Sequence, residues 1–187
     1  MNDTEENSII NKLNTRDYAF IGQCAALMAV CSWITIPSVV PFTMQTFAVF
    51  LTVGLLGGKR GTIAVVIYLL LGAIGLPVFA GFSGGLAYMM GPTGGYIVGF
   101  IGTALVMWFM ERQFGSSRTV LIISMVLGLL VCYAFGTVWF MTVYTKSTGP
   151  IGLGSALSLC VIPYIIPDAL KIALAALLCR RLKRFVS

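Results

Sequence analysis

Six apolar segments, separated by short polar or glycine-rich stretches, dominate this chain. They cover residues 18–36, 43–56, 62–76, 93–110, 119–144 and 155–179. An α-helix rises about 1.5 Å per residue, so about 20 apolar residues cross the roughly 30 Å hydrocarbon core of a bilayer. In lipid, an open strand or loop leaves backbone groups unpaired. The pattern therefore predicts an all-α integral membrane protein with six transmembrane helices, formed by residues 18–187 after a polar tail of residues 1–17.

Composition supports a membrane protein and argues against other classes. Hydrophobic residues make up 58% of the chain and charged residues 10%, against about 25% charged residues in soluble domains. The net charge of +6 resides mainly in turns and chain ends, which argues against a nucleic-acid surface. The five cysteines are dispersed in apolar sequence, and the chain has no histidine to complete a zinc site. We expect a lipid bilayer as surroundings and neither metal nor cofactor.

The distribution of basic residues predicts the orientation. Apart from Lys146 and Lys171, the lysines and arginines lie before residue 18, at the turns around residues 57–61 and 111–118, and after residue 179. Cytoplasmic loops carry the excess of Lys and Arg. Both termini are thus predicted to be cytoplasmic, in a multi-pass protein of the cytoplasmic membrane. The glycine- and proline-rich loops at 37–44, 77–92 and 145–154 would then face outward together.

Two local features of the sequence, a short turn and a break in the last apolar segment, can be interpreted directly. The sequence GGKRG at 57–61 lacks the spacing of a Walker A loop, and we interpret it as a short turn that holds Lys59 and Arg60 between two antiparallel spans. In the last apolar segment, Pro163 and Pro167 interrupt the helical pattern. Because proline is tolerated best in the first turn of a helix, we predict a short helix or loop up to Tyr164 and a true span after it.

The stretch from residue 75 to residue 99 is the most unusual part of the chain. It contains eight of the 21 glycines, no charge, and the aromatic residues Phe79, Phe82, Tyr88 and Tyr96. Two interpretations remain open. The stretch can line or cover a small-molecule pocket, where glycine permits close approach and the rings give stacking surface. Alternatively, it forms a tight turn into a helix seam, since its last glycines follow the GxxxG spacing.

Asp168 and Lys171 are the acid and base that lie well inside an apolar segment. Charges at this depth cost a few kcal/mol, about 2.5–3.5 on insertion scales, and face the bundle interior or a cavity. Their i, i+3 spacing puts both on one helical face. They can be a self-neutralising pair, or Lys171 can bind an anionic group while Asp168 accepts hydrogen bonds from the ligand. Gln45, at the mouth of the second segment, can likewise cap or bridge helices or contact a ligand.

These features resemble the BioY family of biotin-binding subunits of energy-coupling factor (ECF) transporters. The resemblance rests on PFTMQT at 41–46, GKRGT at 58–62, the block LLLGAIGLPVFAGFSGGLAYMMGPTGGYIVGF at 69–100, and the Asp168-x-x-Lys171 pair after Pro163. It implies an ECF S-component-like fold that captures biotin with high affinity. It also implies that the protein works with a transmembrane coupling protein and two ATPase subunits, and that Ala25 and Ala29 form the face that docks the coupling protein.

The resemblance also suggests how biotin would be held. The ligand carboxylate would pair with Lys171, and the ureido N–H groups would donate to Asp168 or Gln45. The apolar rings would lie against aromatic residues of the central block. The full set of predicted substrate-binding residues is Gln45, Phe79, Tyr88, Thr93, Gly94, Tyr96, Asp168 and Lys171.

Two other functions remain as alternatives. The first is a stand-alone secondary carrier for biotin or another small organic anion, driven by protonation of Asp168. The second, an intramembrane Ser/Lys hydrolase, is the weaker one, because Ser83, Ser155 and Ser158 lie in no nucleophile motif. We expect no enzymatic activity.

Overall fold

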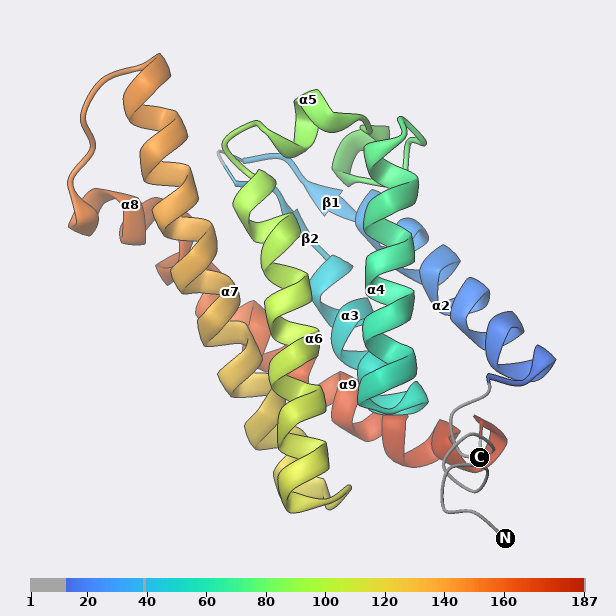
Figure 1. Cartoon of the computed structure of the whole chain (residues 1–187). Coiled ribbons are helices and arrows are strands. Elements are labelled where there is room, and N and C mark those ends of the chain that lie inside the picture. Colours follow the sequence, from blue (N-terminus) through green and yellow to red (C-terminus); the bar gives the residue numbers. More distant parts are fainter. Residues whose placement is uncertain (1–12, 39, 187) are drawn as a thin grey trace, which may run out of the picture.

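The computed structural model describes residues 13–38 and 40–186, and it is a helical bundle (Figure 1). Short elements connect the long helices at one end of the bundle: the hairpin strands β1 (Thr35–Ile36) and β2 (Phe42–Thr43), the 3-10 turn η1 (Ala80–Phe82) and the single-turn helix α5 (Leu86–Met89). The long helices are α2 (Thr15–Trp33), α3 (Gln45–Leu56), α4 (Gly58–Ala73), α6 (Gly94–Phe114), α7 (Arg118–Ser147) and α9 (Ile165–Val186).

These six long helices correspond to the six apolar segments. Within the described residues, three stretches are long and apolar enough to cross a membrane: Gly94–Phe114, Arg118–Ser147, and Leu153–Arg184, which includes α8 (Leu153–Cys160). The break predicted in the last segment is confirmed. Helix α8 is followed by the 3-10 turn η2 (Ile162–Tyr164), which contains Pro163, and Pro167 falls in the first turn of α9. The chain is therefore a helical membrane protein.

The turn between α3 and α4 is shorter than predicted. Gly57 alone connects the two helices, with φ of +80°, a value that favours glycine. Lys59 and Arg60 therefore belong to the first turn of α4, which corrects their placement in the turn. The start of α4 is held from α6, since the Glu111 carboxylate accepts a hydrogen bond of 2.5 Å from the Gly58 backbone N–H. Such a carboxylate satisfies an otherwise unpaired helix N–H and suits the helix dipole.

Helix α2 begins at Thr15, three residues before the first apolar segment. The early start is explained by a capping box at Asn14 and by Asp17, whose carboxylate forms a 2.7 Å ion pair with Arg60 of α4. Most of the predicted tail, residues 1–12, lies outside the described residues.

The seam between α6 and α7 is built from small residues. A Cβ atom on Gly95 would lie 2.2 Å from Cβ of Trp139, and one on Gly99 would lie 3.1 Å from the sulfur of Cys132. The Thr103 hydroxyl donates to the Gly128 carbonyl across the seam at 2.9 Å. The seam interpretation of the GxxxG spacing is thus confirmed for these two glycines.

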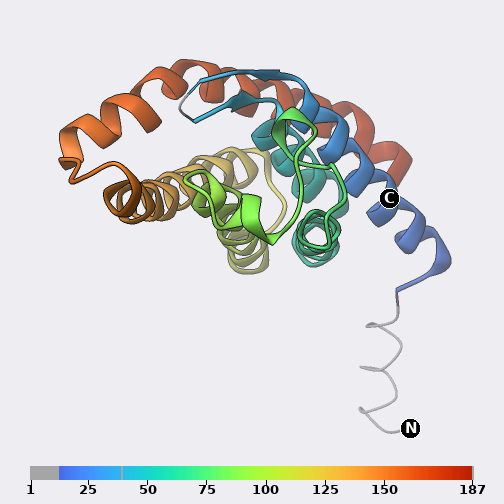
Figure 2. The same ribbon diagram turned by 90° about the horizontal axis from the view of Figure 1, so that it is seen from above.

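Viewed from above, the hairpin and α5 lie at the same end of the bundle (Figure 2). Figure 1 shows this end at the top, while α2 begins and α9 ends at the opposite end. Helix α9 packs mainly against α3, and α7 packs mainly against α6. This arrangement brings the start of α9, the start of α3 and the middle of α7 around one interior space.

Candidate small-molecule site

A cavity of about 70 Å³ lies beneath the hairpin and α5. Its walls come from the hairpin, the start of α3, the α5–α6 connection, the middle of α7, α8 and the start of α9. Segments far apart in the sequence thus meet at one site. The lining residues are Val40, Pro41, Phe42, Thr43, Gln45, Thr46, Ala80, Tyr88, Thr93, Tyr96, Ile97, Phe100, Leu129, Cys132, Tyr133, Cys160, Tyr164, Asp168 and Lys171.

The buried ion pair is the electrostatic centre of this cavity. The Lys171 ammonium lies 2.7 Å from one Asp168 carboxylate oxygen, and each side chain is 5% exposed. The other carboxylate oxygen accepts a hydrogen bond from the Tyr133 hydroxyl of α7. Asp168 also lies in the first turn of α9, where the helix dipole favours a negative charge. Both carboxylate oxygens are therefore paired, as a buried carboxylate requires.

An aromatic ring covers the lysine. The Lys171 ammonium lies 4.1 Å from the ring centroid of Phe42, which is cation–π geometry. Phe42 stacks on Tyr164, with ring centroids 6.4 Å apart. The Tyr164 hydroxyl donates to the Val40 carbonyl and lies 2.9 Å from the Ser38 hydroxyl. The hairpin is thus tied to η2, and its aromatic residue forms part of the roof over the lysine.

Gln45 belongs to a hydrogen-bonded chain that extends away from the cavity. Its side-chain amide donates to the Tyr68 hydroxyl at 2.5 Å, and that hydroxyl donates to the Val78 carbonyl at 2.8 Å. The same carbonyl accepts a 2.6 Å hydrogen bond from Ser32, at the end of α2. Gln45 therefore bridges α3 and α4, as one interpretation predicted, and it also lines the cavity, where contact with a ligand stays a prediction.

Tyr88 of α5, Thr93 of the α5–α6 connection and Tyr96 of α6 also line the cavity. The Tyr96 hydroxyl lies 3.0 Å from the Thr137 hydroxyl of α7, which fixes the ring. Burial raises the pKa of the Tyr88 phenol, so this group stays protonated at neutral pH and can donate a hydrogen bond.

Two predicted binding residues do not line the cavity. Phe79 is fully buried behind Tyr88 and stacks on it, with ring centroids 5.7 Å apart. Gly94 is needed for the backbone path, since a Cβ atom there would lie 1.5 Å from the Met89 carbonyl oxygen. Both residues support the wall rather than face the space: Phe79 packs against Tyr68 of α4, and Gly94 lies in the close turn into α6.

The predicted partner face on α2 also needs correction. Ala25 and Ala29 are 3% and 8% exposed and pack in the chain's own core. The exposed small residues of α2 include Ala19, Gly22 and Ala26, of which the last two are also four positions apart. A Cβ on Gly22 would meet no atom within 4 Å. Helix α2 thus buries one small-residue face and exposes another.

Phe42, Tyr133 and Tyr164 are site residues that the sequence interpretation did not identify. Phe42 lies within the motif PFTMQT, and Tyr133 is the tyrosine in the middle of the longest apolar segment. A hydroxyl at that depth needs a partner, which is the signal that could have marked Tyr133. The position of Tyr164 beside the hairpin follows only from the tertiary fold.

The arrangement can bind a small organic anion that also carries N–H donors. A cation, a carboxylate, an amide and several aromatic rings converge on one space whose charged groups are shielded from solvent, as small-molecule sites require. None of the three serines considered as nucleophiles lines the cavity.

The fold and the site together define a membrane-embedded substrate-binding subunit. The structure is similar to the crystal structure of the S-component for biotin from an ECF-type ABC transporter, with a TM-score of 0.80 and 25% identity over 98% of this chain and 95% of that chain.

The family follows from the sequence comparison: the BioY family model matches residues 4–187, and the chain belongs to the BioY family. It is 43% identical over 164 residues to the biotin transporter BioY of Thermotoga maritima, covering 87% of this chain and 93% of the relative. It is 37% identical over 174 residues to the probable biotin transporter BioY of Pyrococcus horikoshii, covering 91% of this chain and 98% of that relative.

Proposed function

We propose that this protein captures biotin and takes part in its uptake as the substrate-binding S-component of an ECF-type transporter. The observation that carries the proposal is the buried Asp168–Lys171 pair, which lines a cavity walled by aromatic rings in a chain of the BioY family. The names of its relatives, biotin transporters, and of the structural neighbour support the same function.

Biotin suits the chemistry of this site. Its carboxylate is the natural partner of the Lys171 ammonium, and its ureido N–H groups suit the Asp168 carboxylate or the Gln45 side-chain oxygen. Its fused rings present apolar surface to Tyr88 and Tyr96. On binding, the ligand carboxylate would share Lys171 with Asp168, so the lysine keeps a counter-charge with or without the ligand.

Access to the cavity requires movement of the loops at its rim. A volume of about 70 Å³ is small beside the several hundred Å³ usual for small-molecule sites. The hairpin and the segment between α4 and α6 cover the cavity, and Gly75, Gly81 and Gly85 of that segment have no side chain that would restrict a change of backbone conformation. We propose that these loops open outward to admit biotin and close over it.

The proposal includes the rest of the predicted assembly. Six spans with both termini in the cytoplasm would put the cavity near the outer surface, where an uptake protein meets its substrate. A transmembrane coupling protein and ATPase subunits would supply the energy. The exposed side of α2 around Gly22 and Ala26 is the face we propose for the coupling protein.

The decisive experiment is biotin binding to detergent-purified protein, measured by calorimetry, beside variants of the lysine. Lys171→Ala should lower biotin affinity by about a hundredfold or more, because it removes the cation and leaves Asp168 without its counter-charge. Asp168→Asn combined with Lys171→Met should fold, since it leaves no buried charge, and should also bind weakly. Lys146→Ala, at an exposed lysine, is the control and should bind as wild type. Unchanged affinity in the Lys171 variants would contradict the proposal.

A second measurement separates an S-component from a stand-alone carrier. The purified chain alone, in liposomes with a proton gradient, should not accumulate biotin, whereas addition of the coupling protein and the ATPases with ATP should restore uptake. Proton-driven accumulation by the chain alone would favour the secondary carrier.

A further inference from the structure

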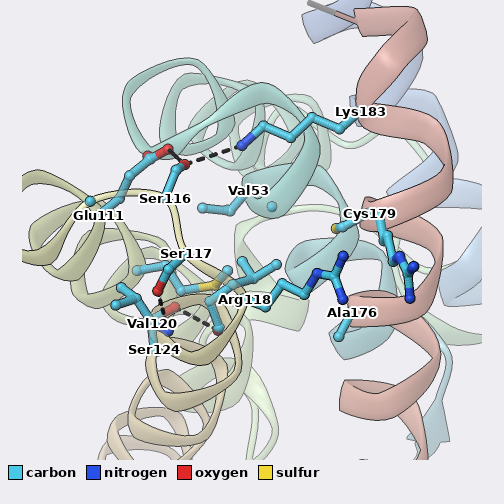
Figure 3. Close-up of a pocket in the computed structure, with 15 residues that line it drawn as sticks. Val53, Glu111, Ser116, Ser117, Arg118, Val120, Ser124, Ala176, Cys179 and Lys183 are labelled. Carbon is cyan, nitrogen blue, oxygen red and sulfur yellow. Dashed lines mark hydrogen bonds between the residues drawn. The ribbon is translucent and has the colours of Figure 1, made fainter.

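A second cavity lies at the opposite end of the bundle, between α3, the α6–α7 turn and the last turns of α9 (Figure 3). Its volume is about 190 Å³, larger than that of the candidate biotin site. Its residues come from three separate regions of the chain. They are Val53, Gly54, Met107, Glu111, Gly115, Ser116, Ser117, Arg118, Val120, Leu121, Ser124, Ala176, Cys179, Arg180 and Lys183.

The floor of this cavity is apolar and buried. Val53 is 3% exposed, and Met107 and Cys179 are 2% exposed. A Cβ atom on Gly54 would lie 2.5 Å from the sulfur of Cys179, so α3 and α9 meet closely here. The cavity therefore has a buried apolar floor between packed helices and an open, exposed rim.

Its rim is basic. Arg118, Arg180 and Lys183 are exposed and line the same space, and Figure 3 shows the Arg118 side chain extending toward α9. Arg118 is the first residue of α7, so the positive end of that helix dipole adds to the field. Three cationic side chains from two helices thus surround an opening to an apolar pocket.

Glu111 contributes one negative charge to this cavity, against three positive ones, and its carboxylate is held by neutral donors. One oxygen of the Glu111 carboxylate accepts the backbone N–H of Gly58, and the other accepts the Ser116 hydroxyl at 3.0 Å. Lys183 donates to the same Ser116 hydroxyl at 3.1 Å. Among the described residues, neither Arg118 nor Arg180 forms an ion pair.

The surroundings indicate an amphiphilic ligand. Ile123 lies one turn beyond Val120 and is 46% exposed, and Leu177 lies one turn before Arg180 and is 49% exposed. In a membrane protein, these apolar flanks of α7 and α9 face lipid chains, while the arginines mark the level of the headgroups. A ligand with an anionic head and apolar tails would satisfy both regions at once.

We propose that this second cavity binds the headgroup of an anionic phospholipid. The phosphate would lie between Arg118 and Arg180, which suit phosphate by their planar, multiple-donor geometry. Basic pockets between membrane helices are well suited to anionic headgroups. The lipid would join α9 to the α6–α7 turn, two regions that otherwise meet here mainly through Lys183 and Ser116.

Native mass spectrometry of the detergent-purified protein, titrated with phosphatidylglycerol or phosphatidylcholine, tests this proposal. Wild type should bind phosphatidylglycerol at least about tenfold more tightly than phosphatidylcholine, and Arg118→Gln combined with Arg180→Gln should abolish that preference. Arg112→Gln combined with Arg181→Gln removes the same charge from exposed positions outside the cavity lining, and it should keep the preference. Circular dichroism and thermal unfolding in detergent check that both double variants fold.

Two results would overturn the proposal. If both double variants lose the preference for phosphatidylglycerol equally, lipid binding depends only on the total charge of the protein and not on this cavity. If sn-glycerol 3-phosphate or inorganic phosphate competes fully with phosphatidylglycerol at similar concentrations, the cavity is a site for a soluble anion instead of a lipid.

Discussion

At the residue scale, Tyr133 is the clearest addition to the site. Its hydroxyl donates to Asp168 from a different helix and helps to fix a carboxylate that lines the cavity. Tyr133→Phe removes that donor while it preserves the ring, so biotin affinity should fall about fivefold, in line with about 1 kcal/mol for a hydrogen bond. Isothermal titration calorimetry of the variant measures the effect.

Tyr18→Phe is the matched control for Tyr133, because Tyr18 is 61% exposed and far from the cavity. It should bind biotin as wild type does. Equal affinity in Tyr133→Phe and wild type would mean that this hydroxyl has no part in holding the carboxylate.

Gly94 supports the site without facing it, and this role predicts a stability effect. Gly94→Ala would put a Cβ atom 1.5 Å from the Met89 carbonyl oxygen, so the turn into α6 must shift. We expect a loss of about 2 kcal/mol or more in the free energy of unfolding, seen as a lower melting temperature in detergent. Gly22→Ala, which meets no atom within 4 Å, should leave the melting temperature unchanged or raise it. The prediction fails if the two variants melt alike.

Some site residues can be recognised in the sequence and others cannot, for a physical reason. A charge inside an apolar segment is costly, so Asp168 and Lys171 stand out from the residue pattern alone. Aromatic residues are common throughout membrane helices, so Phe42 and Tyr164 carry no such signal. Their place at the cavity depends on how the hairpin folds over η2, which residue spacing does not encode.

At the scale of the elements, the apolar segments predicted the long helices well, because polar turns and prolines bound them. The prediction was wrong at the start of α4, where the single glycine link and the Glu111 carboxylate allow the helix to begin at Gly58. Helical spacing also showed that α2 has a small-residue face, but not which face is buried. Only the packing of α2 against α3 and α4 decides that.

The two faces of α2 give a paired prediction. Ala25→Phe adds a ring in the core and should lower the melting temperature, since overpacking costs about 1–3 kcal/mol. Ala26→Phe lies on the exposed face, so it should keep stability and biotin affinity but reduce co-purification with the coupling protein. Pull-down from membranes that contain the full transporter measures this. Normal co-purification of Ala26→Phe would exclude this face as the contact.

At the scale of the whole molecule, the proposed topology can be tested through introduced cysteines. All five native cysteines are buried, so background labelling should be low. Ser147→Cys, at the end of α7, should react with a membrane-impermeant maleimide in intact cells. Gln113→Cys, near the end of α6, should react only after the membrane is permeabilised. The reverse pattern would place the biotin site on the cytoplasmic side and contradict an uptake role.

The Val78 carbonyl receives hydrogen bonds from both Tyr68 and Ser32. Gln45, Tyr68, Val78 and Ser32 therefore form one continuous relay from the cavity wall to α2. The relay uses the Gln45 side-chain N–H, so the Gln45 side-chain oxygen stays available to a donor in the cavity while Tyr68 remains hydrogen-bonded. The end of helix α2 is therefore hydrogen-bonded to the cavity wall, and a substitution at Tyr68 would disconnect the two without touching the cavity lining.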